Sequence, residues 1–367
     1  MVRKRSRLRL QIERLKILLV RLRQIGDIVF TTPAFAALAT RFPSAQLTYV
    51  VEPAGAPVVV GNPHLAHVIV APRLPGMRGL THDVALGRRL ARERFDIAID
   101  FHGGPRASLL TWLSRARRRV GYEIAGRTWM YTDRVGRPRE LRARHSVENQ
   151  WDLLTPLGIE PPTRERYPVE MPLDGLTASR VRERLAAHGV SETMSIVVMH
   201  VSAGNPFRRW PLDSFAQVAV ALAQWSPAIR VIVTSGPSEH DAARHVIDAS
   251  KAQLTSAFQD RVLACGEFSL PELRALTEIA ALYIGGDSGP MHIAGTSRVP
   301  MVSLYGPTLP ARSEPWRAGA PAEAIEVHGL PCRPCNQRVC EPGDFRCLTR
   351  IEPTAVIAAA RRLLGNG

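Results

Sequence analysis

Short apolar runs alternate with helix-like stretches along almost the whole chain, and this alternation is what most constrains the fold. In the first half the strand-like runs lie at 16–23, 46–53, 67–72, 96–103 and 118–123. The helix-like stretches between them lie at 32–41, 80–94 and 105–116. Buried strands separated by helices predict a parallel sheet covered by helices on both faces.

The second half repeats this rhythm, and its strand-like runs end in loops that contain glycine. These runs lie at 195–204, 230–236, 261–266, 281–289 and 300–308. Helices are expected at about 212–224, 238–251, 270–280 and 290–297. We therefore predict an α/β protein with two Rossmann-like, doubly wound parallel-sheet domains that face a central cleft. Ligands of such sheets bind beyond the carboxyl ends of the strands, where the glycine loops lie.

A proline-rich stretch near 160–175 interrupts the pattern and predicts a linker between the halves. The 367 residues are too many for one compact core and suit two domains. We expect a basic arm at 1–15, one domain at 16–172, a second at 173–351 that ends in a cysteine cluster, and a final helix at 352–367.

The chain carries a net charge of +15, which attracts polyanions such as nucleic acid, anionic lipid surfaces and phosphorylated substrates. No apolar run approaches the ~20 residues of a membrane-spanning helix. The basic start lacks the apolar core and small-residue cleavage site of a secretory signal. We therefore expect a cytoplasmic protein.

The loop in YIGGDSGPMHIAG, at 283–295, is the strongest local signal for anion binding. Ser288 and Gly289 would offer free backbone N–H groups at a helix start that begins with Pro290, and such groups suit a diphosphate. An ordinary helix cap at Asp287 or Ser288 is the alternative. The loop matches neither the dinucleotide-binding nor the P-loop glycine pattern.

Two further strand-end loops can bind a ligand. Ser202 and Gly204 precede Arg208, so backbone and side chain together could cradle a phosphate, unless the arginine belongs to a solvated basic turn. Glu239 is expected in the first turn of a helix. Its carboxylate could bind ribose hydroxyls or only complement the helix dipole.

Asp27 follows the first strand, in RLRQIGDIVFTTPAFAAL at 21–38, ahead of a helix expected to begin near residues 31–33. An aspartate beside a helix start stabilises the helix by a few tenths to ~1 kcal/mol. The loop also faces the cleft, opposite the anion loops of the second half, where a general base would be needed for transfer from an activated donor. The local pattern leaves both roles open.

Four cysteines lie close together near the C-terminus in the pattern C-x2-C-x4-C-x6-C, at Cys332, Cys335, Cys340 and Cys347. The first pair has zinc-knuckle spacing, but the other gaps match no standard four-cysteine site. The sequence pattern is compatible both with a metal bound by these cysteines and with free thiols. The fifth cysteine, Cys265, ends a strand and is expected in the core.

Five separated segments make the chain resemble glycosyltransferase family 9, in the order QIGDIVFTTPAFAAL, DFHGGPRASLLTWLSRARRRVGY, RRWP, GDSGPMHIAG and VSLYGPT. The resemblance runs from about residue 16 to the end and includes the cysteine cluster. That family contains the ADP-heptose:lipopolysaccharide heptosyltransferases of the GT-B fold. The resemblance implies an inverting transfer of a heptose or related sugar from an ADP-sugar to a lipopolysaccharide core or similar cell-envelope glycan, with no cofactor.

The resemblance also implies roles for individual residues. Asp27 matches the family's general base, and Arg208 stands where the family usually carries a phosphate-binding lysine. Ser202 and Gly204 belong to the same phosphate-facing loop, and Glu239 matches a carboxylate that contacts ribose.

On the same basis, Phe268 would line the adenine and Asp287 would hold hydroxyls of the donor sugar. Ser288 and Gly289 would bind the diphosphate, with His292 beside them. The chain departs from the family at two of these positions. Arg208 replaces the usual lysine and Ser288 replaces the common threonine, and both replacements keep the chemistry. No Asp-x-Asp metal motif is present, so no metal is expected in this site.

The first domain would then take the acceptor and the second the nucleotide sugar. An anionic glycolipid acceptor suits the basic surface, which leaves open a peripheral contact with the inner face of the cytoplasmic membrane. One rival function is a nucleotide-sugar epimerase on the same fold. Another is nucleic-acid binding, which we do not expect because aromatics are only 6% and no basic stretch interleaves with them.

Overall fold

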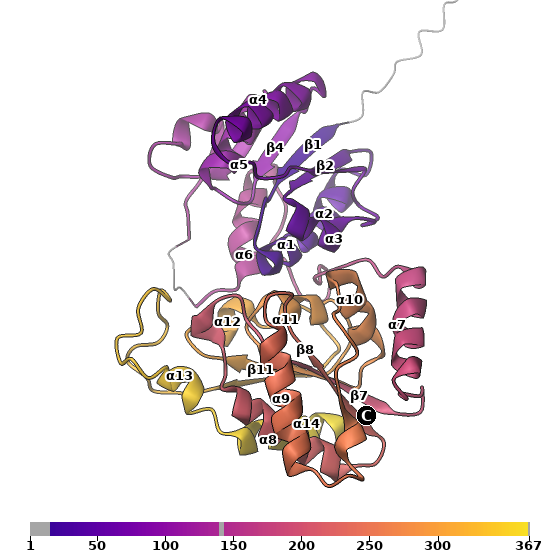
Figure 1. The fold of residues 1–367 in the computed structure, drawn as a ribbon. Helices are drawn as coiled ribbons and strands as arrows, with labels where there is room; N and C mark the ends of the chain where they lie inside the picture. The colour runs from indigo at the N-terminus through magenta and orange to yellow at the C-terminus, as the bar shows by residue number, and fades with distance from the viewer. Residues whose placement is uncertain (1–14, 139–142, 366–367) are drawn as a thin grey trace, which may run out of the picture.

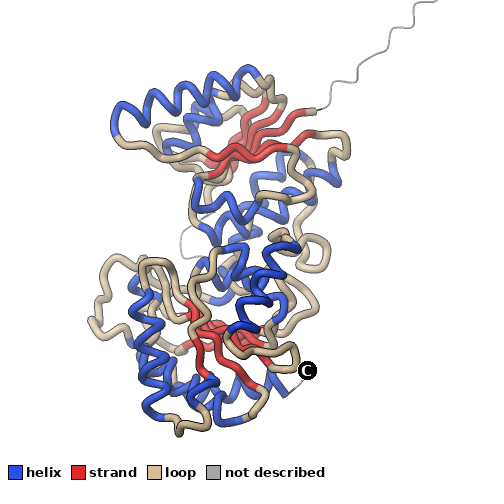
Figure 2. The backbone as a smooth tube through the Cα atoms, turned by 45° about the vertical axis from the view of Figure 1, so that its right-hand side comes forward, coloured by secondary structure: helices blue, strands red, loops and turns tan. Residues whose placement is uncertain are grey.

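Two six-stranded parallel sheets, each with helices on both faces, form the two halves of the molecule in the computed structural model (Figures 1 and 2). The structure describes residues 15–138 and 143–365, so the basic arm expected at 1–15 lies outside the described residues except for its last residue. No helix within the described ranges is both long enough and apolar enough to cross a membrane.

The strands of the first sheet are β1 (Lys16–Val20), β2 (Gln46–Val51), β3 (His67–Val70), β4 (Ile97–Asp100), β5 (Arg118–Tyr122) and β6 (Asp133–Val135). They lie in the order β3-β2-β1-β4-β5-β6. All pairs are parallel, with Ile17 of β1 opposite both Leu47 of β2 and Ile97 of β4. The last four residues of β1 are fully buried, as expected for a central strand with both faces covered.

The helices of the first half are α1 (Ile25–Val29), α2 (Thr32–Arg41), α3 (Ala56–Val59), α4 (Gly76–Arg92), α5 (Pro105–Leu113) and α6 (Ser146–Trp151). Short 3₁₀ turns add η1 (Pro53–Gly55), η2 (Thr128–Met130) and η3 (Asp152–Leu157). The helix expected at 32–41, beginning near residues 31–33, is confirmed as α2. The short helix α1 that precedes it was not predicted.

The strands of the second sheet are β7 (Ser195–His200), β8 (Ile229–Thr234), β9 (Val262–Leu263), β10 (Leu282–Gly286), β11 (Met301–Tyr305) and β12 (Ala322–Glu326). Their order is β12-β11-β10-β7-β8-β9, again with every pair parallel. Numbered within its own half, this is the strand order of the first sheet. Both halves therefore have the Rossmann order, which confirms the predicted fold class.

The helices of the second half are α7 (Gly175–Ala187), α8 (Leu212–Trp225), α9 (His240–Gln253), α10 (Leu270–Ile279), α11 (Gly289–Ala294), α12 (Pro310–Ser313), α13 (Arg346–Thr349) and α14 (Pro353–Gly365). The 3₁₀ turns are η4 (Pro206–Arg208) and η5 (Gln259–Arg261). The final helix α14 stays with this half, because its buried face joins the apolar cluster around Phe215 and Leu304 (Figure 1).

The segment between the halves makes an irregular crossing without strand or helix over residues 159–174. Its backbone is held from both sides. The N–H of Glu170 donates to Thr32 Oγ1 at 2.8 Å in the first half, and the N–H of Val169 donates to the carbonyl of Trp316 at 3.0 Å in the second. One apolar cluster also continues from Ile28 in α1 to Met291 in α11, so the halves meet through packed side chains.

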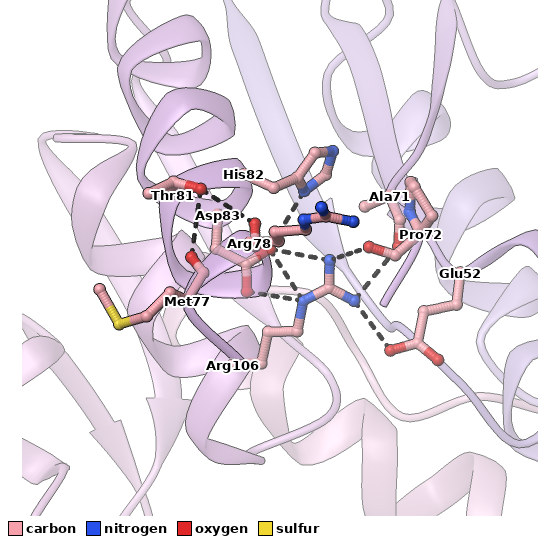
Figure 3. A network of polar contacts seen from close by, with 9 residues as sticks. All are labelled: Glu52, Ala71, Pro72, Met77, Arg78, Thr81, His82, Asp83 and Arg106. Atoms are coloured by element: carbon pink, nitrogen blue, oxygen red, sulfur yellow. Dashed lines mark hydrogen bonds and ion pairs between the residues drawn. The ribbon is translucent and has the colours of Figure 1, made fainter. Parts of the chain in front are cut away.

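A partly buried arginine network fixes the carboxyl edge of the first sheet (Figure 3). Arg106 of α5 bonds Asp83 of α4 through Nε and Nη2, each at 2.9 Å, and Glu52 after β2 through Nη1 at 2.9 Å. It also donates to the carbonyls of Ala71 and Pro72 after β3, at 3.2 and 2.9 Å. The guanidinium is thus fully engaged and ties helices to strand ends, which is a structural role.

Both sheets reverse strand order between their first and fourth strands, and ligands of such sheets bind at this switch point. In the first half this point is flanked by the loop after β4, residues 101–104, and by the loop after β1, which leads directly into α1 and Asp27. In the second half the loops after β7 and β10 flank it, and they include residues 201–209 and 287–288. The predicted anion loops therefore lie at the topologically favoured place.

Candidate active site

A cavity of about 910 Å³ lies between the two halves. The first half contributes residues 24–27, Phe30 and Ser146. The second contributes mainly the loops after β7, β8 and β10, with further residues such as Phe268 and Gln337. Every predicted site residue lines this cavity: Asp27, Ser202, Gly204, Arg208, Glu239, Phe268, Asp287, Ser288, Gly289 and His292. The structure thus brings the whole predicted set together at one site.

Asp27 lies in the first turn of α1, and its carboxylate does not cap the helix. The N-cap position belongs to Gln24, whose φ of 71° is in the left-handed region and whose side chain makes no capping bond. The carboxylate instead pairs with the guanidinium of Arg21, and 36% of the Asp27 side chain stays exposed. The cap alternative is therefore wrong for this side chain, although its charge still complements the start of the helix.

The backbone of Asp27 is held from behind by α6. Gln150 of α6 donates from Nε2 to the carbonyl of Asp27 at 3.1 Å, and Thr31 Oγ1 donates to the same carbonyl at 2.8 Å. His145 caps α6 by accepting from the N–H of Val147, and its Nε2 bonds the carbonyl of Glu314 in the second half at 2.9 Å. The position of Asp27 therefore depends on a helix that is anchored in both halves.

Asp287 follows β10 and is 2% exposed. Thr308 Oγ1 donates to its Oδ2 at 2.6 Å, and Arg208 Nη1 lies 3.2 Å from the same oxygen. Burial opposes ionisation, but His292, Arg208 and the Thr308 hydroxyl outweigh it and hold the pKa of Asp287 well below its usual range. Asp287 is therefore a buried negative charge held by the Arg208 guanidinium and the Thr308 hydroxyl, and it forms no helix cap.

Three buried polar atoms beside Asp287 make no hydrogen bond to any described residue. They are Asp287 Oδ1, Ser288 Oγ and His292 Nδ1. Asp287 Oδ1 lies 3.4 Å from His292 Nε2, beyond good hydrogen-bond geometry. Such atoms are rare in folded proteins because burial without a partner costs free energy. All three residues line the cavity, so their unused hydrogen-bonding capacity can serve a polar ligand there.

The start of α11 differs slightly from the prediction. Ser288 is the N-cap, without a side-chain capping bond, and Gly289 rather than Pro290 is the first helical residue. His292 is buried on the same helix and packs its ring against Phe30 of the first half, with ring centroids 4.5 Å apart. The diphosphate role predicted for Ser288 and Gly289 stays a prediction.

Arg208 lies in η4 and points at the Asp287 loop. Its Nη1 donates to the carbonyl of Asp287 at 3.0 Å, and its Nε donates to Gln337 Oε1 at 2.7 Å. Asn205 also donates to Gln337 Oε1, at 2.8 Å. The Arg208 side chain is 28% exposed and lines the cavity, so it is no solvated turn residue.

Gln337 and Thr308 are site residues that the sequence-based reasoning missed. Gln337 belongs to the cysteine segment, in which no residue of the cleft was predicted. Its positive φ of 60° turns its side chain toward Arg208. Thr308 ends the segment VSLYGPT, so the order of motifs pointed to that stretch without assigning this residue a role.

Ser202 is held by its neighbours. Its Oγ accepts from the N–H of Gly236 at 2.8 Å and lies 3.1 Å from His200 Nε2. Burial lowers the pKa of His200 to about 4, so the ring is neutral and can accept this bond. The Ser202 hydroxyl therefore joins the β7 and β8 loops, whereas Gly204 is exposed with open space around its Cα.

Glu239 and Phe268 lie on the β8 and β9 side of the cavity. Glu239 is the N-cap of α9 rather than a first-turn residue, so the expected helix start was slightly early. Its carboxylate pairs with Arg209 Nη2 at 2.6 Å. Phe268 is half-buried under the guanidinium of Arg184, 5.0 Å from its ring centroid. Both side chains remain accessible from the cavity.

The four C-terminal cysteines line a second cavity of about 280 Å³, together with Phe207 and Phe345. All four are free and partly buried. Within residues 15–138 and 143–365, no group of three or more His, Cys, Asp or Glu is arranged to hold a metal ion. Cys265 is fully buried, as expected. The segment is linked to the main cavity by Gln337, which bonds Arg208, and by Arg333, which donates to the carbonyl of Thr308.

Chemically, the site places a carboxylate on one side and the guanidinium of Arg208 with unpaired polar atoms on the other. An exposed carboxylate such as Asp27 can take a proton from a hydroxyl that attacks within the cleft. Arg208 and the loop around Asp287 can stabilise negative charge that develops on a leaving group. Two Rossmann-like domains with this cleft between them define a GT-B type of enzyme.

The chain matches the family described as glycosyltransferase family 9 (heptosyltransferase) over residues 84–344. It therefore belongs to that family and is a glycosyltransferase. A curated relative, lipopolysaccharide heptosyltransferase 3 of Escherichia coli, is 26% identical over 300 residues, covering 79% of this chain and 83% of the relative.

Two solved structures share the fold. The ADP-heptose lps heptosyltransferase II of E. coli superposes with a TM-score of 0.76 at 20% identity, covering 96% of this chain and 99% of that one. An E. coli heptosyltransferase solved with ADP-2-deoxy-2-fluoro heptose gives 0.68 at 18% identity, covering 96% and 100%.

The epimerase alternative has weaker support. A Listeria monocytogenes protein assigned as a UDP-N-acetylglucosamine 2-epimerase reaches a TM-score of only 0.51 at 14% identity, covering 96% of this chain and 88% of that one. Family membership places the chain among glycosyltransferases rather than among epimerases or nucleic-acid-binding proteins.

Proposed function

We propose that the chain transfers a heptose from ADP-heptose to a hydroxyl of a lipopolysaccharide core or similar cell-envelope glycan, with inversion at the anomeric carbon. The observation that carries this proposal is the cavity between the halves, where Asp27 faces the loops of Arg208 and Asp287. The family match supports sugar transfer, and the names of the relatives support the choice of donor and acceptor.

The donor would occupy the second half's part of the cavity. Glu239 would bind the ribose hydroxyls in place of its present partner, Arg209. Phe268 would contact the adenine. The unpaired atoms of Asp287, Ser288 and His292 would bind the sugar and diphosphate, which explains why these atoms lack partners within the protein.

In the transfer step, the acceptor hydroxyl attacks the anomeric carbon from the face opposite the diphosphate. Asp27 takes the hydroxyl proton as the new carbon–oxygen bond forms, and the bond to the diphosphate breaks. The electron pair leaves with the ADP, whose charge Arg208 stabilises with the dipoles of the neighbouring loop. A single displacement of this kind inverts the anomeric configuration.

We further propose that the protein works at the cytoplasmic side of the inner membrane, where a lipid-anchored acceptor would be presented. The net charge of +15 supports this proposal, because positive surfaces are attracted to anionic lipid headgroups. Binding of the protein to vesicles with and without anionic lipid, titrated against salt, measures that contact.

The test of the proposed function is a donor screen with purified protein. ADP-heptose, UDP-sugars and GDP-sugars are each incubated with and without a truncated lipopolysaccharide core, and products are identified by mass. We expect transfer from ADP-heptose only when the core is present. Conversion of the nucleotide sugar to an epimer without acceptor would instead support the epimerase function.

A further inference from the structure

Arg21 connects the two loops at the switch point of the first sheet. It directly follows β1, and only 11% of its side chain is exposed. Its Nη2 pairs with Oδ2 of Asp27, while its Nη1 donates to the carbonyl of Phe101 just after β4. Its Nε is buried and bonds no described residue. One guanidinium therefore connects α1, which carries the proposed base, with the loop after β4.

The loop after β4 is held by hydrogen bonds and presents a second polar atom without a partner. The buried carboxylate of Asp100 accepts from the N–H groups of His102 and Gly103 at 2.9 and 2.8 Å. Tyr131 donates to the other oxygen of Asp100 at 2.6 Å. Nδ1 of His102 is buried and bonds no described residue. The loop thus fixes the backbone of His102, the residue next to the Phe101 carbonyl that Arg21 contacts.

The surroundings of His102 are positive. Burial and then the nearby cations Arg21, Arg23 and Arg137 lower its pKa to about 4, against an opposing contribution from Asp27. The ring is therefore neutral near pH 7 and can donate or accept a hydrogen bond. Arg23 and Arg137 are exposed, so they add positive potential at the surface near His102.

An arginine held in this way suits exchange between two anions. Its planar fork binds a carboxylate or phosphate oxygen through two parallel donors, and its charge does not titrate in the physiological range. An anionic group brought next to Arg21 by the acceptor would compete with Asp27 for the guanidinium. Oδ2 of Asp27 would then be free to accept the proton of the attacking hydroxyl.

We propose that Arg21 and His102 form a subsite for a negatively charged group of the acceptor, a phosphate or a sugar carboxylate close to the reacting hydroxyl. Binding of that group transfers the Arg21 hydrogen bonds from Asp27 to the acceptor and releases the base. This subsite makes the enzyme selective for anionic acceptors. The inference rests on the proposed function, because it assumes that Asp27 serves an acceptor hydroxyl.

The test compares three acceptors with ADP-heptose as donor. They are a truncated lipopolysaccharide core, the same core after phosphatase treatment, and the same core with its carboxylates reduced to alcohols. We expect at least one treatment to lower kcat/KM of the natural protein about tenfold or more, and the arm that does so identifies the anion. Arg21→Gln should respond to that treatment by less than about twofold.

Three further variants make the result specific. His102→Gln leaves the Arg21–Asp27 pair in place and should reduce the discrimination partly. Arg21→Lys keeps the charge without the fork and should give an intermediate ratio. Arg88→Gln changes an exposed arginine of α4 and should discriminate like the natural protein. ADP affinity and Tm, measured for each variant, report an intact donor half and fold.

The inference is overturned if Arg21→Gln keeps the natural discrimination, or if it loses activity equally on all three cores, which would make Arg21 only a support for Asp27. Equal use of the three cores by the natural protein also overturns it, while leaving sugar transfer intact. Absence of transfer to every core would instead reject the proposed function and this inference together.

Discussion

Gly26 of α1 lies directly against the imidazole of His292 on α11, so that a Cβ at residue 26 would stand 2.3 Å from Cδ2 of that ring. The contact is reciprocated by Gly289 at the start of α11, where a Cβ would lie 3.1 Å from Cβ of Ile25. The two halves therefore approach each other through glycines, directly beside Asp27 and Asp287. This closeness makes the site sensitive to very small changes.

Gly26→Ala should lower kcat at least tenfold, because the new methyl must displace His292 and with it the α1–α11 contact. Overpacking of this kind costs about 1–3 kcal/mol, so the free energy of unfolding should fall as well. Gly136→Ala is the matched control, since nothing lies within 4 Å of a Cβ there. Full activity of Gly26→Ala would show that the halves separate during turnover.

Asp27→Asn should reduce transfer by about 10²–10⁴-fold and leave ADP affinity nearly unchanged. The amide keeps the size of the carboxylate but cannot take the acceptor proton, and Asp27 lies on the half opposite the donor loops. Transfer rates and ADP titrations on the same preparation check this. Transfer within about tenfold of the natural rate would place the base elsewhere.

Arg208→Ala should weaken ADP binding at least tenfold, because it removes the cation closest to the Asp287 loop. Gln337→Ala should weaken it by a smaller factor, since it removes the side chain that orients Arg208 Nε. Calorimetric titration with ADP measures both. Arg338→Ala, an exposed arginine of the same segment, serves as control and should bind ADP normally. Unchanged affinity in Arg208→Ala would remove it from the donor site.

His145 should make the contact between the halves sensitive to acid. Burial lowers its pKa to about 3, with Arg164 and His292 contributing and the bond to the Glu314 carbonyl opposing. An unfolded histidine has a pKa near 6.5, so the unfolded chain takes up this proton first. His145 therefore does not lower the free energy of unfolding above about pH 6.5. The free energy of unfolding falls progressively as the pH drops from 6.5 toward 3.

His145→Asn keeps a side-chain oxygen to cap α6 but removes the titrating ring. Its unfolding free energy should therefore fall less steeply between pH 6.5 and 4, by up to about 1.4 kcal/mol per pH unit relative to the natural protein. Denaturant titrations at several pH values measure the slopes. His328→Asn, at an exposed histidine, should leave the slope unchanged. Parallel slopes for His145→Asn and the natural protein would contradict this assignment.

Most of the fold could be predicted from local pattern, because buried strands and amphipathic helices each require a characteristic spacing of apolar residues in the sequence. The weak elements escaped. β6 and β12 are edge strands whose residues are largely half-buried or exposed, so they lack the continuous apolar run that marks β1. The short α1 escaped because no recognisable capping residue precedes it, and Gln24 begins it from a left-handed conformation.

The candidate site shows the same division. Asp27, Arg208 and Asp287 follow strands, and the rule that ligands bind at the carboxyl edge of parallel strands made them candidates. The resemblance to the family then supplied their expected roles. The partners that set their chemistry come from distant segments. Gln337 reaches Arg208 across 129 positions, and Gln150 reaches the Asp27 carbonyl across 123. No spacing rule connects residues so far apart.

The sequence by itself determined two doubly wound sheets, their glycine loops and the residue types of an anion-binding cleft, because strand and helix periods and turn residues act locally. Only the tertiary structure decided that Asp27 pairs with Arg21 and that Asp287 is held by Thr308 and Arg208. Ion pairs form between side chains that are close in space, and these side chains are brought close only when both sheets have packed.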